Sequence, residues 1–162
     1  MVGSFYLTPP AILYLYKSQI RPKMEYCCHL CGGAAQSTLT GLDRVQNRLR
    51  NLVGDELFSS LEPLSHRRDV ASLSLLYRYF HGKCSDALHS LTFTARTRLA
   101  TSTVANHPHF LRLPNIRRKF HADSFIPRTS SLWNKLPRDC FPSSYNLNTF
   151  KKRVNNHLSS SI

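Results

Sequence analysis

The clearest helical pattern in the chain is SHRRDVASLSLLYRYF, residues 65–80. Its apolar side chains recur at the spacing of one face of an α-helix: Val70, Leu73, Leu76, Tyr77 and Phe80. Leu75 and Tyr79 widen this face, which indicates a helix packed on more than one side. Ser65 is a suitable N-terminal cap, and Gly82 is a suitable end. The sequence therefore predicts a helix over 65–80.

Helices are also expected on either side of this segment. Residues 38–53 carry an apolar stripe at helical spacing, and Gly54 follows as a cap: Leu42, Val45, Leu49, Leu52 and Val53. Further upstream, a helix over 11–20 begins after two prolines, and Pro22 is expected to break or kink it. Short helices are expected over 23–30 and 85–91.

The pattern changes in the C-terminal part of the chain. Residues 92–128 lack helical periodicity and are rich in Thr, Arg, His, Asn and Pro. Within them, residues 110–114 are predicted to form a short strand. Thr129 or Ser130 is expected to cap a turn that carries three apolar side chains: Leu132, Trp133 and Leu136.

A last helix is predicted to start at Asn146 or Asn148. Its apolar face comprises Leu147, Phe150, Val154 and Leu158, and its exposed face Lys151, Lys152 and Arg153. The predicted fold is thus mainly α. A small helical module over 11–91 precedes an irregular basic region, 92–162, which contains the short strand and ends in a helix.

Composition excludes several classes of protein. The 162 residues are 41% hydrophobic and 19% charged, which is typical of one ordinary domain with a core. The longest apolar run, residues 11–16, is far shorter than the roughly 20 residues that span a bilayer. No basic residue precedes that run, so it does not resemble a secretory signal. We expect an intracellular protein of the nucleus or cytoplasm that is neither secreted nor membrane-bound.

The positive charge is concentrated in the second half of the chain. The net charge is +13, and residues 91–162 contribute twelve basic and two acidic side chains. Such a surplus favours a polyanionic partner, which could be RNA, DNA or an anionic membrane face. The plainer alternative is a solvated basic surface with no dedicated ligand.

The cysteines invite a metal-site interpretation that the spacing does not favour. Five cysteines is an odd number, as expected for reduced thiols rather than a disulfide framework. Cys28 and Cys31 form a C-x-x-C with His29 between them, but no second pair of ligands follows. This segment is instead expected to be helical, with Tyr26 and Leu30 packed inward and the thiols buried. We therefore predict no metal and no cofactor.

Motifs for nucleotide chemistry are also missing. The sequence has neither a P-loop nor a dinucleotide-binding glycine motif, and its acids are scattered except for residues 55–56. No catalytic residue is therefore predicted. The single tryptophan, Trp133, could stack bases together with neighbouring aromatics, but a small core that holds the last helix is the favoured interpretation: Phe141, Tyr145 and Phe150.

Four segments, in order along the chain, resemble one family. They are LYKSQIRPKMEYC (15–27), LDRVQNR (42–48), PLSHRRDVASL (63–73) and SLWNKLP (131–137), the last followed by residues 141–151. They are similar to the thumb and post-polymerase region of jockey-type non-LTR retrotransposon reverse transcriptases, which are RNA-directed DNA polymerases. The family's catalytic Tyr-x-Asp-Asp turn lies in the palm, and nothing here matches it. The resemblance thus implies a thumb-like fragment that is not catalytic alone.

In that family the thumb packs against the template–primer duplex. The resemblance therefore implies non-specific binding of RNA or an RNA–DNA duplex, with a palm-containing polymerase chain as a further partner. The predicted phosphate contacts are Arg117, Arg118, Lys119, Lys151, Lys152 and Arg153, followed by Arg112, Arg128 and Arg138. The alternative is an inert remnant, or a protein-interaction module with no nucleic-acid role.

Overall fold

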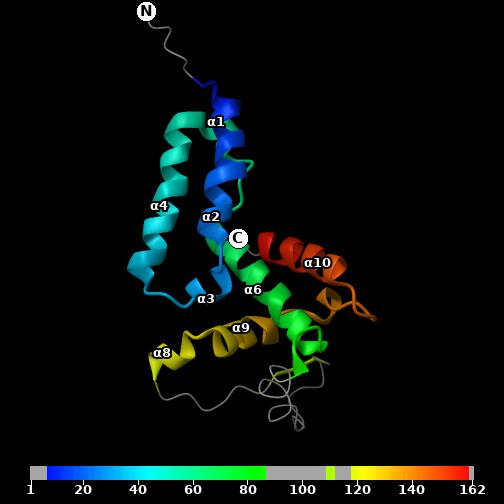
Figure 1. Ribbon diagram of the computed structural model, residues 1–162. Coiled ribbons are helices and arrows are strands. Elements are labelled where there is room, and N and C mark those ends of the chain that lie inside the picture. Colours follow the sequence, from blue (N-terminus) through cyan, green and yellow to red (C-terminus); the bar gives the residue numbers. More distant parts are fainter. Residues whose placement is uncertain (1–6, 87–108, 112–117, 161–162) are drawn as a thin grey trace, which may run out of the picture.

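A computed structural model describes residues 7–86, 109–111 and 118–160 of the chain. Every regular element within these ranges is a helix, so the predicted mainly α fold is confirmed. Figure 1 shows an N-terminal helical hairpin joined to a body in which the long helix α6 lies against two C-terminal helices. None of the helices in this part of the chain has the length and apolar character that crossing a bilayer requires.

The hairpin pairs a segmented first arm with a long second arm. The first arm consists of α1 (Pro9–Leu15), the π-helix η1 (Tyr16–Ile20) and α2 (Arg21–Glu25). The second arm, α4 (Gln36–Val53), lies beside it in Figure 1, and α3 (Cys28–Cys31) forms part of the turn between them. Four side chains form the buried core of the hairpin: Leu13, Tyr16, Leu49 and Val53.

Pro22 does not end the first arm, but the regular α-helix is interrupted just before it, where a break or kink was expected. A proline removes one hydrogen bond and clashes with the carbonyl four residues back. Here the preceding turn is widened to a π-helix, in which Arg21 N–H donates to the carbonyl of Tyr16, five residues back. The helix instead ends after Glu25, and Cys27 adopts a left-handed φ of 52°. The helix predicted over 23–30 is thereby divided into α2 and α3.

The two long helices are confirmed, with corrections at their ends and faces. α4 ends at Gly54, whose φ of 83° favours glycine, but Val45 and Leu52 of its predicted apolar stripe are exposed. After the short α5 (Asp55–Phe58), α6 runs from Leu64 to Phe80. Its N-cap is Pro63 rather than the predicted Ser65.

The C-terminal end of α6 is closed as predicted. Gly82 has a φ of 65°, and its N–H donates to the carbonyl of Tyr79 over 3.0 Å. Lys83 N–H donates to the carbonyl of Arg78 over 2.8 Å, which completes a Schellman motif. Most of the helix predicted over 85–91 lies outside the described residues.

In the C-terminal half, the described residues form four short or medium elements. They are α8 (Lys119–Ala122), α9 (Phe125–Asn134), the 3-10 helix η3 (Arg138–Cys140) and α10 (Leu147–Ser159). Thr129 and Ser130 are buried within α9 and do not cap it, because the helix begins earlier, after Ser124. Leu111 is not in a strand: its N–H and carbonyl bond the side chain of Asn134 over 2.9 and 2.8 Å. Residues 112–114 of the predicted strand lie outside the described ranges.

The main core is aromatic and joins α6 to both α9 and α10. Trp133 and Phe150 are fully buried, and Trp133 Nε1 donates to the carbonyl of His109 over 2.7 Å. Tyr77 of α6 stacks on Phe150 with ring centroids 4.1 Å apart. The interpretation as a core is confirmed for Trp133, Phe141 and Phe150, so Trp133 is not available to stack bases, whereas Tyr145 is 38% exposed. The core draws on both predicted regions, whose boundary at 91/92 lies outside the described residues.

Asn146 fixes the start of α10, as the sequence predicts. Its side-chain oxygen accepts a hydrogen bond from Thr149 N–H over 2.9 Å. Replacing Asn146 with alanine is expected to lower the free energy of unfolding by about 1 kcal/mol, because one helix-end N–H loses its partner. Urea denaturation checks this, and Asn148→Ala, at an exposed position of the same helix, is the matched control. Equal stabilities of the two variants would contradict the capping role.

Candidate nucleic-acid interface

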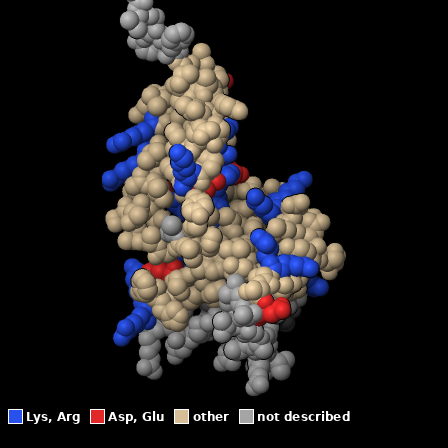
Figure 2. Space-filling view, in the orientation of Figure 1, with Lys and Arg blue, Asp and Glu red and all other residues tan. Residues whose placement is uncertain are grey.

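The structure places the predicted phosphate contacts at two separate ends of the body. Lys151, Lys152, Arg153 and Arg138 lie on α10 and η3, and Arg118 and Lys119 lie at α8; all six are exposed. Figure 2 shows basic side chains over both regions, with mainly uncharged surface between them. Arg112 and Arg117 lie outside the described residues. The basic residues therefore form two sites rather than one continuous patch.

The three consecutive basic residues of α10 face different surroundings. Successive residues of an α-helix point about 100° apart. Lys151 lines a small cavity together with Glu25 and Glu62, whereas Arg153 lines a groove on the other flank. Lys152 lies between them in sequence and is exposed. The three side chains therefore point in different directions around the helix.

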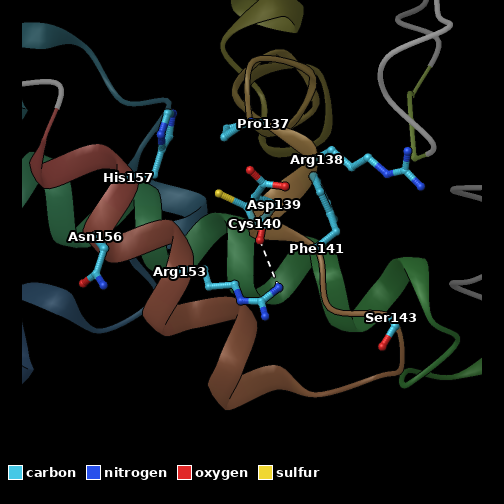
Figure 3. Close-up of a pocket in the computed structure, with 9 residues that line it drawn as sticks. All are labelled: Pro137, Arg138, Asp139, Cys140, Phe141, Ser143, Arg153, Asn156 and His157. Atoms are coloured by element: carbon cyan, nitrogen blue, oxygen red, sulfur yellow. Dashed lines mark hydrogen bonds between the residues drawn. The ribbon is translucent and has the colours of Figure 1, made fainter.

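A groove lies between η3 and α10. It has a volume of about 770 Å³ and is drawn in Figure 3. Its lining residues are Pro137, Arg138, Asp139, Cys140, Phe141, Ser143, Arg153, Asn156 and His157. The lining comes from two segments that the aromatic core holds together, because Cys140, Phe141 and Phe150 are all buried in that core.

The two arginines of this groove differ in how they are held. Arg153 reaches from α10 towards η3, where its Nη1 donates to the carbonyl oxygen of Asp139 over 3.0 Å. Arg138 extends from η3 away from α10. Neither forms an ion pair with a carboxylate among the described residues. The groove therefore presents two guanidinium groups, one anchored and one extended, with Ser143 and Asn156 as neutral hydrogen-bonding groups.

The thiol of Cys140, which lines the groove, is poorly suited to act as a nucleophile. Burial raises the pKa of the Cys140 thiol above its ordinary value, and the neighbouring Asp139 carboxylate raises it further, against an opposing effect of Arg153. The thiol is therefore protonated and uncharged at neutral pH, and thiols in that form are poor nucleophiles.

Arg128 has an internal role, which corrects its assignment as a phosphate contact. Its Nη2 donates to the carbonyl of His29 over 3.1 Å and to Ser72 Oγ over 3.4 Å, and its Nη1 lies 3.8 Å from an Asp69 oxygen. The side chain is only 17% exposed. Its guanidinium holds α9 against α3 and α6, so we remove it from the set of phosphate contacts.

Counting charges along the sequence missed a basic face on α4. Several acids of the N-terminal half form ion pairs with arginines: Arg67 pairs with Glu25 and Glu62, and Arg68 pairs with Asp43. Arg44 and Arg48, one turn apart on α4, are exposed and pair with no acid among the described residues. Figure 2 shows basic side chains projecting over α4. The four-residue spacing in the sequence was the available signal.

The cysteine segment departs from its prediction in part, because Cys27 is only half-buried. Cys28 is buried, and burial, together with the nearby Glu25 carboxylate, raises the pKa of its thiol. Tyr26 and Leu30, however, are 78% and 66% exposed, so the prediction that they pack inward is wrong. The left-handed conformation of Cys27 between the two helices places these side chains on the surface. No group of three metal-ligating side chains occurs within the described part of the chain.

Comparisons with protein-family models, with curated proteins and with solved structures find no match to this chain.

Proposed function

We propose that this chain is a thumb-like fragment of a retrotransposon-encoded reverse transcriptase. In this proposal it binds template RNA or an RNA–DNA duplex through phosphate contacts and is not catalytic alone. The sequence resemblance supports the family assignment, and the exposed basic side chains support the binding role. Such a function belongs to the nucleus or cytoplasm.

The observation that carries the binding role is a set of exposed basic side chains that pair with no acid among the described residues. Several carboxylates of the N-terminal half are paired with arginines, as Glu25 is with Arg67 and Asp43 with Arg68. The predicted phosphate contacts that the structure describes are exposed and, Arg128 apart, pair with no acid among the described residues: Arg118, Lys119, Arg138, Lys151, Lys152 and Arg153. Cations left free in this way can neutralise phosphates and release counterions.

The proposal is tested by removing charge from the groove. Arg138→Gln with Arg153→Gln is expected to weaken RNA binding for every sequence alike and to reduce the slope of log affinity against log salt by about 2, roughly one per phosphate contact. Fluorescence anisotropy with labelled RNA over a salt series measures both effects.

The control removes the same charge elsewhere. Lys23→Gln with Arg78→Gln alters two exposed basic residues on α2 and α6, away from the groove. This pair is expected to leave the slope unchanged. If both pairs lowered the affinity and the slope equally, binding would depend on total charge, and the groove would have no special part in it.

A protein-interaction role for the N-terminal hairpin is the second candidate. Several large apolar side chains of the hairpin are exposed: Tyr14, Leu15, Ile20, Val45 and Leu52. Contiguous apolar surface often marks a protein contact. A palm-containing polymerase chain is the partner we propose for it. Weak or salt-insensitive binding of RNA by the folded chain would favour this role over nucleic-acid binding.

A further inference from the structure

Phe120 on α8 is the most exposed large apolar side chain in the described part of the chain. Its side chain is 90% exposed, although it follows two basic residues, Arg118 and Lys119. Phe120 does not contribute to the stability of the core, because it belongs to neither hydrophobic cluster.

A hollow of about 680 Å³ opens beside Phe120, between α8 and the start of α4. Small residues, Gly33, Ala34 and Ala35, form part of its lining and leave room for a flat ligand. Gly33 is required there, because a Cβ at this position would clash with the carbonyl oxygen of Asp123. The close approach of these two turns brings Phe120 and the start of α4 to the same hollow.

Basic, acidic and neutral side chains all line the hollow or flank it. Lys119 lines the hollow, and Arg118 precedes it at the N-cap of α8. Asp123 and Gln36 also line it, so a phosphate group inside would meet a carboxylate, whereas the amino group of a base would meet two acceptors. An uncharged aromatic base therefore fits the hollow, and the phosphates on either side of that base fit the basic residues of α8.

We propose that this hollow is a stacking site for one unpaired nucleobase, with Phe120 as the platform. The ring stacks on the base, while Arg118 and Lys119 contact the flanking phosphates. Stacking of bases on exposed aromatics beside basic residues is the usual way in which proteins hold single strands without sequence preference. This inference rests on the proposed nucleic-acid binding and adds a preference for single-stranded segments to it.

The test compares single-stranded and duplex RNA of equal length. Phe120→Ala is expected to weaken binding of the single strand on the order of tenfold, within the range for loss of one base–aromatic stack, and to change duplex affinity by less than about twofold. Phe120→Trp keeps a platform and is expected to retain single-strand affinity. A 2-aminopurine base in the single strand is expected to be quenched by the wild-type chain and not by Phe120→Ala.

Tyr14→Ala is the matched control, because Tyr14 is also an exposed aromatic, 75% exposed, but lies on α1. Circular dichroism is used to check that each variant is folded. Equal single-strand affinities of wild type and Phe120→Ala would overturn the stacking site and leave Phe120 as a contact for a protein. An equal loss of single-strand and duplex binding would also overturn it. Failure of the wild type to bind any nucleic acid would instead refute the proposed function.

Discussion

Replacing Trp133 with alanine is expected to lower the free energy of unfolding by about 3–5 kcal/mol, because a large buried side chain is lost and its cavity closes only in part. Trp133 is fully buried, with its ring centroid 4.8 Å from Phe141 and 5.7 Å from Phe150. A small domain is stable by only about 5–15 kcal/mol, so most of its margin would disappear.

The measurement is urea denaturation followed by far-UV circular dichroism, since the variant has no tryptophan fluorescence. Trp133→Phe is the control: it keeps an aromatic ring in the core but loses the hydrogen bond from Nε1 to the carbonyl of His109. Its loss of stability is expected to be clearly smaller. If Trp133→Ala were as stable as the wild type, the aromatic cluster would not be what holds the body together.

This prediction also bears on the groove. The relative position of η3 and α10 depends on Cys140, Phe141 and Phe150, which are buried in the same core. Loss of Trp133 is therefore expected to displace Arg138 from Arg153 and to weaken RNA binding even where helix content is retained.

The helices could be predicted from the sequence because their signals are local. The apolar periodicity of residues 65–80, the cap at Asn146 and the positive φ of Gly54 and Gly82 depend on neighbours in the chain. The behaviour around Pro22 could not be predicted, because a π-turn that accommodates the proline is one of several local solutions. The true start of α9 was missed although it follows Ser124, a common N-cap residue, whose side chain here makes no capping hydrogen bond.

The candidate site was harder to predict, because it depends on tertiary contacts. Arg128 and Arg153 look equivalent in sequence, yet one is held by His29, Ser72 and Asp69 and the other remains at the surface. The exposure of Phe120 was likewise hidden, because an aromatic residue in sequence is more often a core residue than a surface one.

The second large expected effect is that of salt on the affinity for nucleic acid. It follows if the chain binds nucleic acid through phosphate contacts. Each phosphate neutralised on a duplex contributes about −0.9 to the slope of log affinity against log salt, and about −0.7 on a single strand. If four of the six exposed residues predicted as phosphate contacts take part, the affinity for an RNA–DNA duplex should fall on the order of 100-fold between roughly 50 and 200 mM salt.

The most direct measurement is therefore binding of the wild-type chain to labelled RNA, DNA and RNA–DNA duplex across that range of salt. We expect binding to all three, with slopes of log affinity against log salt of about −3 to −4 on the duplexes. Circular dichroism at each salt concentration controls for unfolding. Absent binding, or an affinity that does not change with salt while the chain stays folded, would contradict the account.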